Sequence, residues 1–243
     1  MKKYGILLLL LLVAVTAGAR DYAASLFGIQ SNGTTNNTAS IQKAIDFISA
    51  HGGGTLVFYV GRYLTGSVML KTGVYIRLEE GAVLVGSSSP YDYKDSSGTR
   101  ALVVAVGQSS VGISGKGVVE GAGSTLVDNT RRQLKAGYLA GDVTPALVVF
   151  KNCTNVSVAG LHLWYGPYAA LTLTGCRIVS VEDVDINGKN ISTSRGIVLS
   201  GCSWVTMTGM FIQVAGEPVT ASGNQHVTVE HSVTDTGKIL SAS

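Results

Sequence analysis

The sequence predicts an all-β solenoid, a parallel β-helix, and three observations support this prediction. Apolar residues recur between Cys153 and Thr234 with a period of roughly 22 to 26 residues, which is typical of solenoid proteins. Within each period they come in pairs two positions apart, the spacing of a β-strand. Glycine is abundant, with 31 residues, and stands at the expected bends, as in Gly175, Gly201 and Gly223.

The repeat is visible when Cys153, Cys176, Cys202 and Asn224 are each taken as a starting point. At the same offsets follow Val156, Val158, Leu161 and Leu163; Val179, Val181, Val184 and Ile186; Val205, Met207, Met210 and Ile212; and Val227, Val229, Ser232 and Thr234. These predict two short strands per unit, and a third precedes each start at 147–150, 171–173 and 197–199. A unit of three short strands buries its apolar face only by stacking on a neighbour.

The same pattern continues upstream, less regularly. The further inward-facing positions expected there are Val74, Ile76, Leu78, Val83 and Val85 in one coil, and Val103, Val104, Val111, Ile113, Val118 and Val119 in another. About seven or eight coils are therefore expected in all.

Residues 38–50 form the one helix that the sequence predicts. Ile41, Ala44, Ile45 and Ile48 share one face, and three glycines at 52–54 end the helix. This helix is expected to cover the exposed first coil, because a solenoid needs a cap.

Residues 1–19 are predicted to be a secretory signal peptide. Two lysines precede an apolar run at 6–15, and small residues at 17–19 suit cleavage. A membrane anchor is the alternative, but the run is short for spanning a bilayer. The prediction is therefore a periplasmic or extracellular protein without a membrane span, with one β-helix domain over residues 20–243.

Charge and cysteine content limit the partners. The net charge of +3 falls to about +1 once the leader lysines are removed, which is too small for nucleic-acid binding by charge alone. Cys153, Cys176 and Cys202 share one coil position, where parallel side chains disfavour a disulfide, so a buried ladder is expected rather than a bridge with one thiol left over. No CxxC or paired histidines accompany them, so neither a metal nor a cofactor is expected.

Several ordered motifs resemble those of a known family. They are DYAASLFG at 21–28, SIQKAI at 40–45, GGGTLV at 52–57, YLTGS at 63–67, LEEGAVL at 78–84, GKGVVEG at 115–121 and TPALVVF at 144–150. In this order they resemble glycoside hydrolase family 28, the polygalacturonases, especially the exported bacterial members. The resemblance implies a right-handed, pectin-lyase-like parallel β-helix. It also implies a pectic polysaccharide or oligogalacturonate as substrate.

The resemblance further implies inverting hydrolysis, which needs an acid and a base about 6.5–9.5 Å apart. The family supplies them from Asn-Thr-Asp on one coil and Asp-Asp on the next, followed by Gly-His-Gly and Arg-Ile-Lys. Here those positions hold Arg195 for the first aspartate, Gly216 for the acid and Glu217 as the one retained carboxylate. Lys238 stands near the Gly-His-Gly position, without a histidine, and the chain stops at Ser243. The hypothesis is a degenerate or C-terminally truncated family member, a pseudoenzyme.

Candidate binding residues follow from the same register, which is expected to stack Arg195, Glu217 and Lys238 on successive coils along one groove. Arg195 and Lys238 could hold galacturonate carboxylates, although an Arg195–Glu217 ion pair is an alternative. Trp164 and Tyr168 suit stacking on sugar rings, although loop packing is an alternative.

The amino-acid sequence leaves two questions open. Glu182, Asp183 and Asp185 form an acidic group that suits either calcium or a solvated outer face, and the solvated face is favoured. The alternatives to a pectin hydrolase are a non-catalytic carbohydrate-binding or structural β-helix, and a gene fragment.

Overall fold

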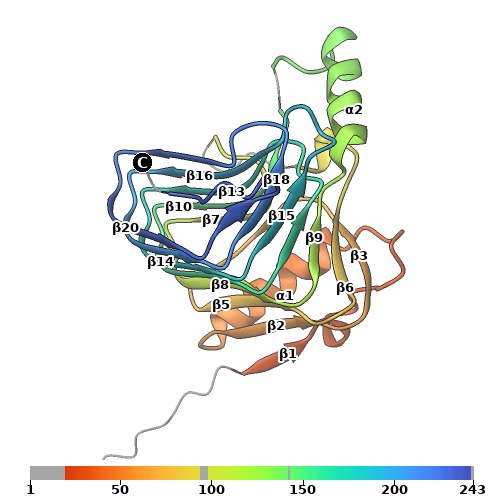
Figure 1. The fold of residues 1–243 in the computed structure, drawn as a ribbon. Coiled ribbons are helices and arrows are strands. Elements are labelled where there is room, and N and C mark those ends of the chain that lie inside the picture. Colours follow the sequence, from red (N-terminus) through yellow and green to blue (C-terminus); the bar gives the residue numbers. More distant parts are fainter. Residues whose placement is uncertain (1–19, 94–97, 142, 242–243) are drawn as a thin grey trace, which may run out of the picture.

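The chain winds into a parallel β-helix (Figure 1). The structure is a computed structural model that describes residues 20–93, 98–141 and 143–241, so the predicted leader at 1–19 lies outside the described residues. Each coil adds one strand to each of three sheets, and the paired strands are parallel throughout. The predicted fold class is confirmed.

The three sheets, named A, B and C, contain eight, seven and six strands. Sheet A consists of β1 (Asp21–Ala23), β2 (Gly54–Phe58), β5 (Val74–Leu78), β8 (Ser109–Gly115), β11 (Thr154–Ala159), β14 (Arg177–Glu182), β17 (Ser203–Thr208) and β20 (Gln225–Glu230). Sheet B consists of β3 (Gly61–Thr65), β6 (Ala82–Gly86), β9 (Val118–Glu120), β12 (His162–Trp164), β15 (Asp185–Gly188), β18 (Phe211–Val214) and β21 (Val233–Thr234). Sheet C consists of β4 (Val68–Met69), β7 (Ala101–Val106), β10 (Ala146–Lys151), β13 (Ala169–Thr174), β16 (Arg195–Ser200) and β19 (Val219–Ser222).

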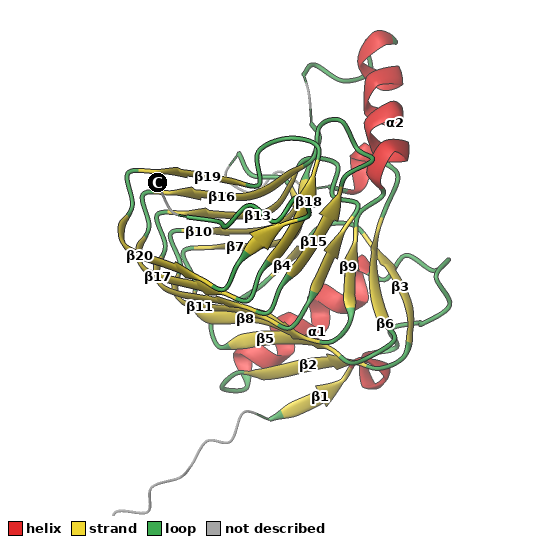
Figure 2. Ribbon diagram, in the orientation of Figure 1, coloured by secondary structure: helices red, strands yellow, loops and turns green. Residues whose placement is uncertain are grey.

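The core lies between the sheets. Figure 2 shows sheets A and C as opposed walls, with sheet B closing one side. The predicted register holds in the regular part of the chain: Val156 pairs with Val179, and Val179 with Val205. These side chains are buried, and each contributes about 1.5–3 kcal/mol relative to exposure.

One upstream prediction is wrong by a single residue. In β6 the buried side chains are Ala82 and Leu84, whereas Val83 and Val85 are only half-buried on the outer face. Residues 82–85 are all apolar, so alternation alone does not distinguish the two faces. A shift of one residue exchanges the two faces.

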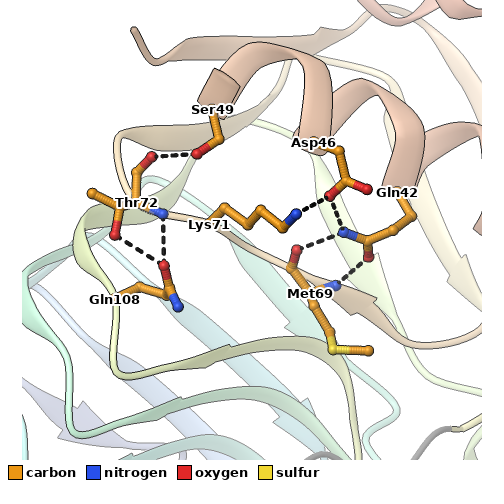
Figure 3. Close-up of polar contacts among 7 residues, drawn as sticks. All are labelled: Gln42, Asp46, Ser49, Met69, Lys71, Thr72 and Gln108. Carbon is orange, nitrogen blue, oxygen red and sulfur yellow. Dashed lines mark hydrogen bonds and ion pairs between the residues drawn. The ribbon is translucent and has the colours of Figure 1, made fainter. Parts of the chain in front are cut away.

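The predicted capping helix α1 (Thr38–Ala50) is confirmed, and its four predicted core residues are fully buried. Gln42 attaches it to β4, the edge strand of sheet C, because its amide donates to the Met69 carbonyl (3.0 Å) and accepts from the Met69 N–H (2.8 Å). An Asp46–Lys71 ion pair of 2.8 Å and a bond from Ser49 to the Thr72 carbonyl reinforce this attachment (Figure 3). The helix thus satisfies backbone groups that an edge strand would leave unpaired.

A second helix, α2 (Gly123–Lys135), was not predicted. It projects from the solenoid between β9 and β10 (Figure 1). Only Gly123, Leu126 and Thr130 are buried, so its sequence lacks the wide apolar stripe that marks a core helix. Two short 3₁₀ turns, η1 (Ala24–Phe27) and η2 (Pro90–Asp92), complete the helical elements of the described ranges. Neither α1 nor α2 has the length and apolar character that crossing a bilayer would need.

The three cysteines are buried and unbridged, as predicted. The Cys176 N–H lies 3.3 Å from the sulfur of Cys202, consistent with stacking on successive coils. Hydrogen bonds to the sulfurs of Cys153 and Cys202, together with burial, raise the pKa of the Cys176 thiol. Cys176, the middle residue of the ladder, is therefore a neutral thiol packed in the core.

The bend that leads into sheet A repeats an uncommon conformation. Its glycines at 175, 201 and 223 take left-handed angles, with φ of 62°, 63° and 62°. The second residue of five successive strands is also left-handed but is not glycine: Ser110, Asn155, Ile178, Trp204 and His226, with φ of 53°, 57°, 57°, 59° and 54°. We call these five residues the left-handed column. Side chains other than Asn, Asp and His rarely adopt this conformation.

Candidate functional site

A groove of about 450 Å³ lies on the outer face of sheet C. Residues of β10 and β13, Tyr168, and the segments 98–100 and 143–144 line it. The two segments lie immediately before β7 and β10, so the groove runs beside the turns that enter sheet C. We call it the sheet C groove.

Strand alternation places the floor residues. Val148 and Phe150 of β10 point into the core, so Val149 and Lys151 point outward. Thr172 and Thr174 of β13 pair in register with these two outward residues. Two neighbouring strands therefore present one ammonium group and two hydroxyls to the same opening.

The lining of the groove suits an anionic sugar. It contains the cations Arg100 and Lys151 and the ring of Tyr168, which is 40% exposed, but no Asp or Glu among its described residues. Cationic side chains form charge-assisted hydrogen bonds with carboxylates. An aromatic ring offers an apolar face with a polar edge. This combination can bind a uronate, whereas a proton donor for bond cleavage is missing from the described lining.

Arg195 lies on the coil after Tyr168, and the two side chains meet. Arg195 pairs in the ladder with Ala169, and its guanidinium carbon lies 5.6 Å from the centre of the Tyr168 ring. This is within the range of a cation–π contact. In the described part of the chain the alternative ion pair between Arg195 and Glu217 does not form. Arg195 instead extends the positive charge beside the groove by one coil.

Glu217 occupies the next coil, as the register predicted. Its backbone carbonyl accepts the Gly196 N–H at 3.1 Å, and the residue is exposed.

At the neighbouring position, Gly216, a backbone carbonyl leaves little room for a side chain. Its N–H donates to the Ser194 carbonyl at 3.0 Å, and a Cβ placed on Gly216 would lie 2.8 Å from the same oxygen. Ser194 is itself buried, with its hydroxyl donating to the Gly188 carbonyl and accepting the Ala215 N–H. The turn is packed for glycine, and a carboxylic acid side chain does not fit without movement.

The expectation that Lys238 stacks on Glu217 in a further coil is wrong. After β21 the chain reverses, and Val233 bridges Ile239 in antiparallel fashion. The Thr234 N–H donates to the Lys238 carbonyl at 2.9 Å. The repeat had already faded to polar residues at Ser232 and Thr234, and the last turn follows this change.

Trp164 lies apart from the groove, on the outer face of sheet B. Its indole N–H donates to the Asp185 carboxylate at 2.8 Å, and His162 lies 3.0 Å from the same oxygen. Asp185 thus serves a side-chain network and is separated from Glu182, which ends a strand of sheet A. Within the described ranges no three His, Cys, Asp or Glu side chains gather as a metal site requires.

Four lining residues of the sheet C groove were not predicted from the sequence: Arg100, Lys151, Thr172 and Thr174. Alternation along 146–151 and 169–174 would have marked Lys151 and both threonines as outward-facing, because the intervening residues are the predicted core. Arg100 lies in a loop, where no periodic signal exists.

Comparison with known proteins places this geometry in context. Residues 60–242 match the family model for glycosyl hydrolases family 28. An exo-poly-alpha-D-galacturonosidase of Dickeya chrysanthemi is 27% identical over 87% of this chain, and the match covers 40% of that protein. The chain therefore spans well under half of this curated relative.

Solved structures show the same fold. A candidate glycosyl hydrolase from Parabacteroides merdae superimposes with a TM-score of 0.87 at 39% identity, covering 90% of this chain and 100% of that one. A family 28 exopolygalacturonase of Yersinia enterocolitica superimposes with a TM-score of 0.79 at 18% identity, covering 89% of this chain and 49% of that one.

Proposed function

The chain belongs to glycosyl hydrolases family 28, and from this premise we propose that it binds acidic pectic chains in the sheet C groove without efficient hydrolysis. The ligand is polygalacturonate or an oligogalacturonate. The galacturonosidase name of the Dickeya relative supports this substrate class.

The observation that carries the proposal is the meeting of the Tyr168 ring with the Arg195 guanidinium, whose carbon lies 5.6 Å from the ring centre, beside the groove. Arg100 and Lys151 are also among the lining residues, and each has a further interaction within this chain. A polyanion gains from such a surface, and the positive charges also raise its rate of encounter. Tyr168 and the two floor threonines provide contacts for the uncharged parts of each sugar ring.

Weak hydrolysis follows from the residues at the family's catalytic positions. A positioned acid or base contributes a factor of about 10² to 10⁴ in rate. Gly216 supplies no acid, Arg195 replaces one carboxylate, and Glu217 alone remains. Glu217 by itself supplies a base without an acid on the opposite face of the sugar.

The proposal includes export of the protein. Residues 1–19 read as a cleaved leader, and a pectic polymer is a partner met outside the cell. N-terminal sequencing of the secreted protein would check this, since a mature chain that starts near Arg20 is expected and an intact Met1 would contradict it.

The binding experiment uses calorimetry with oligogalacturonate and a reducing-end assay on polygalacturonate. Lys151→Met and Tyr168→Ala should weaken binding, each by about three- to tenfold. Trp164→Phe should leave the affinity unchanged, because Trp164 lies on sheet B rather than in the groove. Unchanged affinity in both groove variants would exclude the groove. Turnover that Glu217→Ala abolishes would show an active enzyme and overturn the proposed lack of hydrolysis.

A further inference from the structure

A second and larger groove, of about 1000 Å³, lies on the outer face of sheet A. Because sheets A and C are opposed walls (Figure 2), this groove faces away from the sheet C groove. Its lining comes from four successive strands, β11, β14, β17 and β20, so it runs along the solenoid axis. We call it the sheet A groove.

The floor of the sheet A groove is a row of hydroxyls. One hydroxyl side chain per coil faces outward, and the four pair in register: Ser157, Ser180, Thr206 and Thr228. Successive hydroxyls are therefore separated by the interstrand distance of about 4.8 Å. A linear chain of sugar rings laid along the axis meets a polar contact at each coil.

One wall of the groove is the left-handed column. Asn155, Ile178, Trp204 and His226 of this column line it, and Ile178 and Trp204 are 49% and 55% exposed. Asn155 is the type of residue that tolerates the backbone angle there. Ile178 and Trp204 do not relieve that strain, and about half of each residue stays exposed, so neither backbone geometry nor core packing accounts for them.

Trp204 is held in a fixed orientation. Its ring stacks on His226 with centroids 4.0 Å apart and planes 1° from parallel. One face of the indole is thereby covered and its freedom reduced before any ligand arrives. A fixed aromatic face lowers the entropic cost of binding, and a flat apolar surface is what the C–H face of a sugar ring contacts.

The charge of the lining selects among saccharides. Arg177 and Glu182 are its two fully charged residues, of opposite sign, and the Glu182 carboxylate accepts a hydrogen bond from Ser180. The sheet C groove, by contrast, has two cations and no described carboxylate. A balanced groove has no net attraction for a polyanion, so its charge fits an uncharged chain.

We propose that the sheet A groove binds an uncharged saccharide chain along the solenoid axis, with one sugar ring on Trp204 and hydroxyl contacts along the Ser/Thr row. A protein partner fits less well, because a continuous row of hydroxyls runs along the floor. This site is independent of the pectate-binding function proposed for the opposite face.

The test is affinity electrophoresis of the full protein in gels that contain galactan, arabinan or xylan as the uncharged polysaccharide. We expect at least one of them to retard the protein. Trp204→Asn should weaken that binding about tenfold or more, and Thr206→Val several-fold. Asn occupies the equivalent position at Asn155, and Val keeps the shape of Thr, so both variants should fold. Tyr138→Asn, at an exposed aromatic residue elsewhere, is the matched control and should bind normally.

Fluorescence gives a second measurement, because the chain has two tryptophans. In a Trp164→Phe background Trp204 is the only reporter, and an oligosaccharide from the retarding polymer should shift its emission. The proposal is overturned if no uncharged polymer retards the protein, or if Trp204→Asn is retarded like the wild type. It is also overturned if Trp204→Asn only dissociates a dimer seen by sedimentation. Polygalacturonate binding should survive Trp204→Asn, so failure here is distinguishable from failure of the sheet C groove.

Discussion

Replacing Gly216 by alanine adds a single carbon at the position that the resemblance equates with the family's general acid. That carbon would lie 2.8 Å from the Ser194 carbonyl oxygen and 3.5 Å from Cγ of Arg195. The oxygen cannot retreat freely, because it accepts the Gly216 N–H at 3.0 Å. Overpacking of this kind costs about 1–3 kcal/mol. At about 2–4 °C per kcal/mol for a domain of this size, Tm should fall by about 2–12 °C.

Thermal unfolding followed by circular dichroism measures the effect. Gly141→Ala is the control, because a Cβ at Gly141 meets nothing within 4 Å and its φ is outside the left-handed region. The control should melt within about 1–2 °C of the wild type, as ordinary surface substitutions do. If Gly216→Ala melts together with Gly141→Ala, the added carbon does not clash with the Ser194 carbonyl and the reasoning fails.

Three other predictions concern the core, a buried phenol and the cap. Val181→Asp places a carboxylate in a fully buried coil position and should abolish the cooperative transition, whereas Val181→Ala should cost about 2 kcal/mol; urea unfolding distinguishes them. Burial, and secondarily the charge of Asp92, raises the pKa of Tyr93, whose hydroxyl donates to the Ser87 carbonyl at 2.7 Å. The contribution of Tyr93 to stability is therefore fully present below the unfolded pKa of about 10. It is lost as the pH rises above that value, by up to about 1.4 kcal/mol per pH unit. Tyr93→Phe should reduce the pH dependence of the unfolding free energy, measured with urea between about pH 9 and 11. Gln42→Leu leaves both Met69 backbone groups without the amide and should cost about 1–3 kcal/mol, seen as an earlier urea midpoint; an unchanged midpoint would mean that water replaces the amide.

The sequence predicted most of the fold because the register of the repeat is a physical constraint. Val181 and its equivalents must face the core. From Cys153 onward the strict two-residue period allows only one assignment of residues to the inner and outer faces of each strand. Where four apolar residues follow one another, as around Val83, both faces satisfy the pattern and the prediction was wrong. Helix α2 was missed because it buries little apolar surface and needs no apolar stripe.

The candidate site was predicted only in part. Arg195 begins β16 and Glu217 lies two residues before β19, and the Gly196 N–H donates to the Glu217 carbonyl, so the two residues lie on adjacent coils as the register requires. Lys238 lies past the point where Ser232 and Thr234 replace apolar residues, and there the register no longer constrains the chain. The exposed Trp204 ring was not predicted either, because left-handed backbone angles at residues other than glycine do not change the hydrophobic periodicity.

The bond pair between Gln42 and Met69 also fixes the register of β4, the first strand of sheet C. A side-chain amide that donates to and accepts from one residue of β4 engages that strand at a single position. Sliding β4 by one residue would turn its outward groups inward and break both bonds. Since β7 and the later strands of sheet C are each aligned on the one before, the helix defines the register from which the later strands of sheet C follow. Inserting one residue between Gln42 and Met69 should therefore disturb coils far beyond the insertion unless the connecting loop absorbs it.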